Sequence, residues 1–408
     1  MSEWKKVKLG DCCEITSSKR IFFSEYVESG IPFYRSKEII EKGKGEEISH
    51  PLYISKAKYD EIKGKYGVPQ KGDLLLTAVG TLGIPFVVKD DSPFYFKDGN
   101  LVWLKHFQDI DPIFLYFWIK SENVYNALYN IAIGSAQKAL TIAAIKGYEI
   151  PLPPLQTQHR IANILSRYDS LIENYQKQIK LLEEAAQRLY KEWFVDLRFP
   201  GHENTKIVDG VPEGWEKKTI ADVCTNISSG STPSRSNKAY WENGTIKWVK
   251  TKELQDGWIL DTEEYISQEG YNSSSTKMFP ANTILMAIYA SPTLGRLGIL
   301  SIDCCCNQAA LGLIADENII SWQWLFWKLY ELRDEFNAIA RGAGQQNISG
   351  IVVKNKEIII PDKGVIDGFT SVVSKMFEQQ KSLSSQLRLL TEARDRLLPK
   401  LMSGEIAI

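Results

Sequence analysis

The sequence predicts a mixed α/β (α+β) fold: two similar globular domains, joined and separated by two long antiparallel coiled-coil helices with pseudo-two-fold symmetry. Three observations predict it. One segment recurs at a constant offset, each copy contains short apolar runs between turn-forming residues, and each copy is followed by a long coiled-coil pattern. Self-similarity at a fixed spacing indicates a duplicated structural unit, and 408 residues are enough for two globular domains.

The repeat is clearest where each globular domain is expected to end. Residues 134–137 (GSAQ) lead to residues 150–154 (IPLPP), and residues 342–345 (GAGQ) lead to residues 358–361 (IIIP) at the same offset. Two copies of one unit are expected to carry two similar binding sites at a fixed separation. Each copy is a normal domain of about 150 residues.

Short apolar runs bounded by Gly, Pro, Asn and Asp predict strands within each copy. The aligned pairs are residues 4–9 with 215–220, 31–39 with 246–254, and 72–77 with 281–286. The apolar, aromatic-rich residues 113–119 and 322–329 predict helices. Each copy is therefore expected to combine strands and helices.

Two long segments carry the pattern of a coiled coil, in which apolar residues alternate at spacings of three and four. An antiparallel pair places Tyr168 opposite Ala393 and Ala185 opposite Met376, whereas a parallel pair leaves voids between small residues. Two separate amphipathic helices are the alternative. The predicted core of the pair is Ile164, Tyr168, Leu171, Tyr175, Leu182 and Leu189 in the first helix, with Val372, Met376, Leu383, Leu390 and Leu397 in the second.

These patterns divide the chain into four parts. We expect a first globular domain at residues 1–155 and a first spacer helix at 156–199. A linker rich in Gly and Pro then leads into a second globular domain, together residues 200–361. The second spacer helix and a C-terminal tail follow at residues 362–408.

Composition describes an ordinary globular protein. Hydrophobic residues make up 44%, and the net charge is −1, so a DNA partner is neither indicated nor excluded, because DNA binding needs only a local basic face. No apolar run reaches the roughly 20 residues that span a bilayer, and the N-terminus lacks a signal region. We therefore expect a cytoplasmic protein without a membrane partner. The six cysteines show no C-x-x-C spacing and are interpreted as small buried residues in a reducing compartment.

Signatures of catalysis are absent from the sequence. It contains no G-x-x-x-x-G-K-[ST] loop, no dinucleotide fingerprint and no G-x-S-x-G elbow. The four histidines are scattered, without an H-E-x-x-H motif, so we expect no metal site and no catalytic residue. The prolines at 153 and 154 lack the polar and aromatic neighbours of an adenine methyltransferase loop.

The junction between the first copy and the first helix carries a family resemblance. Residues 134–137 with 150–161 resemble the end of a target-recognition domain and the start of the spacer helix in specificity subunits of type I restriction–modification enzymes. Residues 240–248 (YWENGTIKW) resemble the opening of that family's second domain. The second copy departs from the pattern, because residues 361–364 (PDKG) replace the PLPPL run. The likeness spans essentially the whole chain.

The resemblance implies a non-catalytic subunit that recognises DNA. Each target-recognition domain would read one half of a bipartite double-stranded DNA target, and the helices would set the unread gap and dock two modification (methyltransferase) subunits. Restriction subunits would complete an ATP-dependent endonuclease. No cofactor is expected on this chain, because S-adenosylmethionine, ATP and Mg would belong to the partner subunits.

Base reading requires paired donors and acceptors, as in Arg or Lys with guanine and Asn or Gln with adenine, while phosphates are contacted by cations and hydroxyls. Such residues recur in matching loops of the two copies. The predicted DNA-binding residues of the first copy are Arg35, Ser36, Lys37, Thr77, Thr81, Gln137 and Lys138. Those of the second are Lys250, Thr251, Lys252, Thr293, Arg296, Asn307, Gln308, Gln345, Gln346 and Asn347.

Each group has a structural alternative. Residues 35–37 and 250–252 are also typical of solvated charged turns, and the glycines near Thr81 and Arg296 suit a turn as well as a close approach to phosphate. The glutamines of the repeat are equally suited to capping a helix. For the whole protein, an adaptor with two protein-binding domains is the alternative, and steep salt dependence of DNA binding distinguishes the two.

Overall fold

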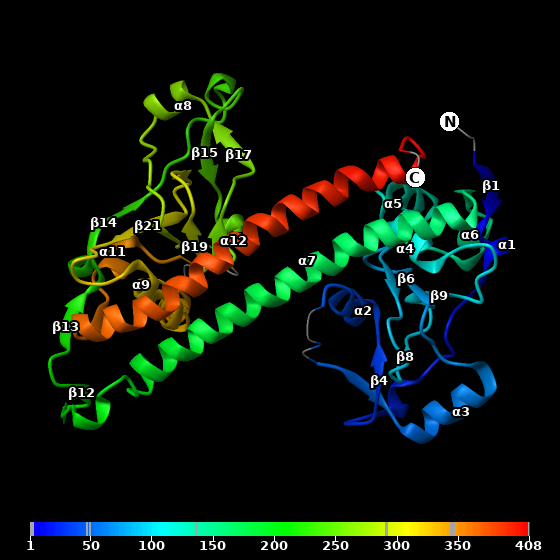
Figure 1. The fold of residues 1–408 in the computed structure, drawn as a ribbon, viewed down its shortest axis with the longest axis horizontal. Helices are drawn as coiled ribbons and strands as arrows, with labels where there is room; N and C mark the ends of the chain where they lie inside the picture. The colour runs from blue at the N-terminus through cyan, green and yellow to red at the C-terminus, as the bar shows by residue number, and fades with distance from the viewer. Residues whose placement is uncertain are drawn as a thin grey trace. The chain divides into compact units, whose positions relative to one another are not determined.

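The computed structural model describes residues 4–45, 48, 50–134, 138–289, 293–342, 347–406 and 408. The chain forms two compact units: unit 1 comprises Met1–Asn174 and Leu389–Ile408, and unit 2 comprises Tyr175–Arg388. Both unit boundaries fall inside long helices, α7 (Leu155–Tyr190) and α12 (Lys363–Met402) (Figure 1). Each unit therefore contains a globular body and one part of each long helix.

The body of unit 1 is built on three small sheets. An antiparallel sheet has the order β2 (Glu14–Thr16), β9 (Leu101–Lys105), β6 (Leu74–Thr77), β7 (Pro85–Val87). A second has the order β3 (Tyr26–Val27), β5 (Leu52–Ile54), β4 (Ile31–Tyr34), β8 (Tyr95–Phe96), with β4 and β8 parallel. Strand β1 (Lys5–Lys8) pairs with β10 (Glu149–Leu152). Strand β6 is buried on both faces, which explains its uniformly apolar LLL sequence.

Helices cover these sheets. They are α1 (Leu9–Cys12), α2 (Ser36–Gly43), α3 (Lys56–Tyr66), α4 (Pro112–Lys120), α5 (Glu122–Ile131) and α6 (Ile142–Gly147), with a 3-10 turn η1 (Phe23–Glu25). Helix α4 confirms the helix predicted at residues 113–119. The Asp111 side chain caps it by accepting a 2.7 Å hydrogen bond from the Phe114 amide, and Phe114 is buried in the same cluster as Ile161 and Leu165 of α7.

Unit 2 repeats this plan. Its main sheet has the order β14 (Cys224–Ser229), β21 (Ala310–Ala315), β18 (Ile284–Ala287), β19 (Leu297–Leu300), β16 (Gly257–Ile259). The second sheet is β17 (Glu264–Ile266), β15 (Ile246–Val249), β20 (Cys305–Cys306), and β13 (Glu216–Thr219) pairs with β22 (Glu357–Ile360). The hairpin β11 (Ile207–Val208) and β12 (Val211–Pro212) lies in the stretch expected to be a linker.

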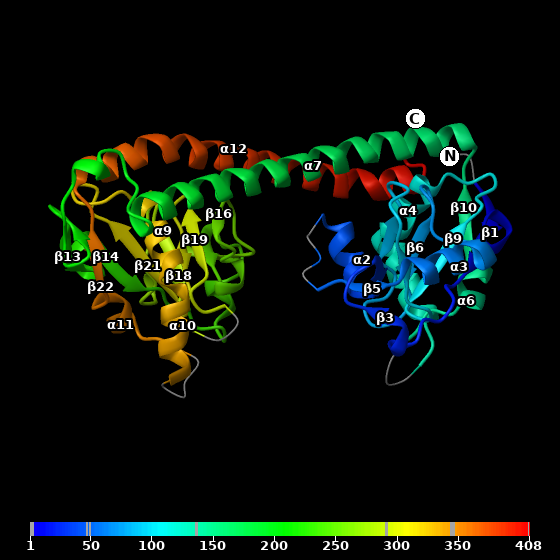
Figure 2. The same cartoon turned by 90° about the horizontal axis from the view of Figure 1, so that it is seen from below.

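The helices of unit 2 correspond to those of unit 1. They are α8 (Gln268–Asn272), α9 (Trp322–Glu331), α10 (Arg333–Gly342) and α11 (Gly350–Lys354), with a π-helix η2 (Lys191–Val195) after α7 and 3-10 turns η3 (His202–Asn204), η4 (Ile220–Val223), η5 (Lys238–Tyr240) and η6 (Thr251–Glu253). Helix α9 confirms the helix predicted at residues 322–329. Figure 2 shows α12 along one end of the main sheet of unit 2 and α10 at the opposite end.

Equivalent hydrogen bonds correct one detail of the predicted alignment. Gly72 donates to Val88 O at 2.9 Å, and Asn282 donates to Leu300 O at 2.8 Å. Gly72 therefore corresponds to Asn282, whereas the sequence alignment placed it opposite Ala281. Both residues have positive φ, +91° and +67°, and asparagine is among the residues that best replace glycine in that conformation.

The two long helices run antiparallel within each unit, as predicted. In unit 1, Arg394 Nη1 lies 2.8 Å from Asp169 Oδ1. In unit 2, the Tyr190 ring centre lies 6.1 Å from that of Phe369. Later residues of α7 thus meet earlier residues of α12. The Asp169–Arg394 contact is one residue from the predicted pairing of Tyr168 with Ala393.

The predicted core is displaced by one residue at two positions, one in each long helix. The prediction is wrong for Leu171 and Val372, which are 45% and 42% exposed, whereas the following residues Ile172 and Val373 are buried. Leu383 is buried as predicted. The remaining predicted core residues are half-buried: Ile164, Tyr168, Tyr175, Leu182, Leu189, Met376, Leu390 and Leu397.

The globular bodies account for this displacement. The coiled-coil prediction assumes that each long helix packs only against the other. Here a globular body also packs against another side of the helix pair. In unit 2, Phe377 of α12 packs edge-on against Trp322, with ring centres 5.0 Å apart, and Trp258 donates to Phe377 O at 3.2 Å. The buried stripe therefore rotates toward the body, as in an ordinary amphipathic helix.

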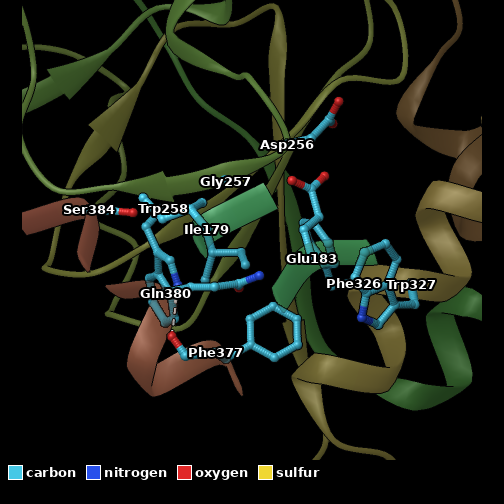
Figure 3. A pocket seen from close by; sticks show the side chains of 11 residues that line it. Ile179, Glu183, Asp256, Gly257, Trp258, Phe326, Trp327, Phe377, Gln380 and Ser384 are labelled. Atoms are coloured by element: carbon cyan, nitrogen blue, oxygen red, sulfur yellow. Dashed lines mark hydrogen bonds between the residues drawn. The ribbon is translucent and has the colours of Figure 1, made fainter. Parts of the chain in front are cut away.

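A cavity of about 30 Å³ lies in unit 2 between α7, α12 and the body. Figure 3 shows the Glu183 carboxylate of α7 pointing toward Asp256. Asp256 is held by Arg333, whose Nη1 donates to Asp256 Oδ2 at 3.0 Å. Burial, and secondarily the negative charge of Asp256, raises the pKa of Glu183.

Glu183→Gln is expected to stabilise unit 2 at high pH. A carboxyl whose pKa is raised by folding stabilises the folded state fully below its unfolded pKa, roughly 4.3, and loses that contribution as the pH rises through its folded pKa. The variant should melt about 2–4 °C higher at pH 8 and close to the parent at pH 4. Thermal melts at both values measure this, with Glu184→Gln as the control, because the Glu184 side chain is 38% exposed. An equal shift at both values would contradict it.

Five cysteines are buried and Cys224 is half-buried. Burial raises the pKa of Cys13 and Cys304 to about 12. These thiols are therefore held in the unreactive protonated form. Among the described residues, no helix is both long enough and apolar enough to cross a membrane.

Candidate nucleic-acid interface

Segments distant in sequence meet in unit 1 through backbone hydrogen bonds. The amide of Lys97 donates to Tyr34 O at 2.8 Å, Ala78 donates to Asn100 O at 2.8 Å, and Leu140 donates to Ala78 O at 2.9 Å. These bonds join the ends of β4, β6 and β8 to the segment before α6. We call residues 34–37, 77–83, 97–100 and 138–140 the loop strip of unit 1.

Unit 2 contains the same construction. Asn307 donates to Val249 O at 3.0 Å, Ile288 donates to Ala309 O at 2.9 Å, and Ile348 donates to Ile288 O at 2.9 Å. The loop strip of unit 2 comprises residues 249–252, 287–289, 293–296, 307–309 and 347–348. The duplication therefore preserves a surface to which each of the predicted groups of polar residues contributes.

The Arg35 side chain pairs with a carboxylate in the first turn of α2, the helix that Arg35 precedes. Its guanidinium Nε lies 3.1 Å from both carboxylate oxygens of Glu38, whose side chain is 2% exposed. Burial raises the pKa of Glu38, but the hydrogen bonds from Arg35 outweigh it and hold the pKa below its usual range. The Ser36 hydroxyl donates to Asn100 O at 3.2 Å, and Lys37 lies 3.5 Å from Glu41. Ser36 therefore ties the start of α2 to segment 97–100, whereas Arg35 and Lys37 pair with carboxylates of α2 itself.

Lys250 matches Arg35 in role. Its Nζ lies 2.5 Å from Glu264 and 3.4 Å from Glu263, and the hydrogen bond that Lys250 donates to Glu264 raises the pKa of Lys250. Lys252 also pairs with Glu263, and Thr251 starts the turn η6. Residues 250–252 thus form a charged turn that is largely neutralised internally.

The two threonines predicted to contact DNA in the loop after β6 differ in exposure. Thr77 is completely buried, and its hydroxyl accepts the Ile84 amide at 2.9 Å to close the loop. Thr77 is therefore not available for the predicted contact with DNA. Thr81 is exposed at the loop tip. In unit 2, the Thr293 hydroxyl donates to Tyr289 O at 3.2 Å.

The strip of unit 2 also carries the predicted amide side chains. The Oδ1 atom of Asn307 is buried and has no hydrogen-bond partner among the described residues. Gln308 accepts from the Thr232 hydroxyl. Asn347 is exposed and forms a β-bridge with Tyr289. Gln137, Gln345 and Gln346 lie outside the described residues.

Two predicted cations have no carboxylate partner in the described part of the chain. In unit 1, Lys138 Nζ lies 3.8 Å from the ring centre of Tyr129, a cation–π contact. In unit 2, Arg296 is half-buried and its amide donates to Thr293 O at 2.9 Å. Lys138 and Arg296 are therefore the positive charges of the two strips best suited to contact an anion.

Sequence reasoning missed the helices that flank each strip. On α5, the Tyr125 ring would lie 3.5 Å from a side chain at Gly83, and Tyr129 supports Lys138. On α10, Asn337 donates to Leu294 O at 3.5 Å, and Arg341 donates to Asn337 O at 3.3 Å. Tyr125 and Tyr129, like Asn337 and Arg341, are four residues apart and so lie on one face of their helix. Each helix stands just before the predicted loops, and this spacing can be recognised in the sequence.

Known proteins resemble this chain along its whole length. A family model for the type I restriction modification DNA specificity domain matches residues 1–184 and 212–383. The specificity subunit of type I restriction enzyme MjaIX from Methanocaldococcus jannaschii is 26% identical, covering 100% of this chain and 94% of that protein. The HindI specificity subunit from Haemophilus influenzae is also 26% identical, covering 100% of both chains.

A solved structure shares the fold. The crystal structure of the S subunit of a type I restriction–modification system from M. genitalium matches with a TM-score of 0.66. The match covers 98% of this chain and 96% of that chain at 16% identity. The duplicated architecture is thus one that an experimental structure also shows.

Proposed function

Because this chain belongs to the family of type I restriction modification DNA specificity domains, we propose that its two units read the two halves of one bipartite DNA target. The observation that carries the proposal is the duplicated loop strip. Equivalent backbone hydrogen bonds in both units gather residues of the types that contact DNA. Lys138 and Arg296 supply the charge, and Thr81, Gln308 and Asn347 supply polar groups near them.

The chain itself is assigned no catalytic step. We assign base modification to two methyltransferase subunits that use S-adenosylmethionine, and ATP- and Mg-dependent cleavage to restriction subunits that join them. Family membership supports this division of labour, as does the absence of cofactor-binding motifs from the sequence. This chain then supplies recognition and spacing.

The long helices are the proposed docking site for the modification subunits. Leu171 and Leu389 are 45% and 58% exposed in unit 1, and Leu181 and Val372 are 54% and 42% exposed in unit 2. Exposed apolar side chains on helices whose opposite side is buried are typical of an interface with another protein. Both units carry such residues, which fits one partner subunit for each unit.

Replacing Lys138 or Arg296 with alanine is expected to weaken binding of the assembled complex to its target DNA. Each lost phosphate contact should reduce the slope of log affinity against log salt by roughly 1. Titrations between about 50 and 200 mM salt measure this. Lys56→Ala is the matched control, because Lys56 already pairs with Asp60 at 2.5 Å outside the strip. An unchanged slope in both variants would favour the adaptor alternative.

A further inference from the structure

Unit 1 exposes two adjacent aromatic side chains beside its loop strip. Phe22 and Phe23 are 62% and 86% exposed, which is costly for residues of this size in water. They lie in the connection between β2 and β3. Figure 2 places β3 at the end of unit 1 away from α7. Their exposure therefore needs a functional explanation.

The two rings stand on a rigid support. The Phe22 amide donates to Glu25 Oε2 at 2.8 Å, and the Glu25 amide donates to Phe22 O at 2.9 Å, so both ends of the turn η1 are closed. Glu25 is tied to Lys58 of α3 at 2.9 Å. Beneath, the Tyr26 ring lies 5.7 Å from Phe23, edge to face. The rings are thus presented in a fixed place at little further cost in conformational entropy.

Arg20 and the backbone of Lys19 join the segment that carries the two rings to the loop strip. Arg20 Nε lies 2.8 Å from Asp98 Oδ2, and Asp98 belongs to the segment 97–100 of the strip. The Arg20 side chain is still 70% exposed. The Lys19 amide donates to the Tyr95 hydroxyl at 2.6 Å, at the strand that leads into the same segment. An exposed apolar pair thus continues directly from the surface proposed to face DNA, with the exposed Arg20 guanidinium, which is paired with Asp98, between them.

The corresponding connection of unit 2 is built differently. Between β14 and β15, Trp241 packs edge-on against Trp248 at 5.0 Å, and the Arg235 guanidinium covers Trp241 at 3.5 Å. Among the described residues of this connection, no large apolar side chain is exposed. The exposed pair is therefore a property of unit 1 alone and not a requirement of the shared fold.

We propose that Phe22 and Phe23 form a wedge that inserts between base pairs of the first half-site and unstacks one base step. This rests on the proposed function. Apolar wedges of this kind, flanked by cations, are used by DNA-binding proteins to kink the duplex. Pyrimidine–purine steps unstack most easily, so the wedge favours such a step. Two protruding rings are too small a surface for a stable protein interface, which needs about 800 Å² per partner.

The test uses the complex of this chain with its modification subunits and duplexes that carry the mapped target. Each duplex carries one fluorescent 2-aminopurine in one of the two half-sites. It replaces an adenine or stands at a position where the complex tolerates any base. Binding should raise its fluorescence at one step of the first half-site. Phe22→Ala/Phe23→Ala should abolish that rise and weaken binding roughly tenfold. Phe22→Leu/Phe23→Leu should retain part of both effects.

The outcomes separate this proposal from the proposed function. Salt-dependent, target-specific binding without any fluorescence rise in the first half-site would overturn the wedge and leave the reading function standing. A complex that fails to bind the target at all would count against both. Loss of complex assembly by the double alanine variant, with an unchanged melting temperature, would show that the rings touch a protein partner and would also overturn the wedge.

Discussion

Phe369→Ala is expected to lower the free energy of unfolding of unit 2 by about 3–5 kcal/mol, the cost of emptying a buried aromatic site. Phe369 of α12 is completely buried. Its ring centre lies 5.0 Å from Phe194 and 6.1 Å from Trp193, both in η2, and 6.1 Å from Tyr190, the last residue of α7. This side chain thus packs the second long helix against the end of the first and against the π-helix that follows it.

Denaturant unfolding of the full chain, followed by tryptophan fluorescence, measures the effect, since Trp193 and Trp324 report on this cluster. Phe369→Leu is the matched control and should cost less than about 1.5 kcal/mol, because it nearly conserves volume. An alanine variant within about 1 kcal/mol of the parent would show that the two helices are not held together at this point.

Lengthening both long helices by seven residues is expected to widen the unread gap of the DNA target by about three base pairs. Seven residues add roughly 10.5 Å of helix, and base pairs rise 3.4 Å each. The insertions belong after Asn174 in α7 and after Arg388 in α12, where both unit boundaries fall. A heptad returns each helix close to its original face, so the packing within each unit is preserved.

Genome-wide mapping of modified bases in cells that express the variant reads the gap directly. An insertion in α7 alone is the control. It shifts α7 against α12 by a heptad, so the Asp169–Arg394 contact of unit 1 cannot persist together with the Tyr190–Phe369 contact of unit 2. We expect the single insertion to lose modification. A doubly lengthened variant that modifies targets with the original gap would contradict the role of the helices as a ruler.

The parts of the fold that depend on local sequence periodicity or on the duplication were predictable from the sequence. The duplication, the two long helices and helices α4 and α9 follow from periodicity within short stretches of sequence. The antiparallel direction followed from matching large with small side chains. The core positions Leu171 and Val372 were wrong because a seam argument considers only two helices, whereas the globular bodies bury a further side.

For the candidate site, the sequence predicted the types of residue better than it predicted which of them are available to contact DNA. The Glu38 partner of Arg35 stands only three residues along the chain, and its carboxylate also accepts the Arg35 amide at 2.8 Å. The Glu264 partner of Lys250 comes from another strand, and only tertiary pairing brings it there. Thr77 was predicted as a contact because it follows a strand, yet the turn uses its hydroxyl internally. The loop strips themselves arise from long-range backbone hydrogen bonds that no motif encodes.

The central claim is that one chain carries two separate readers of DNA. Mapping modified bases in a host that expresses this chain with its modification subunits, beside a chain carrying Arg296→Ala, tests it most directly. We predict a target of two short specific sequences separated by a fixed unread gap, with Arg296→Ala relaxing or weakening one of them and leaving the other unchanged. A single continuous target, or a substitution in unit 2 that alters both halves equally, would contradict the account.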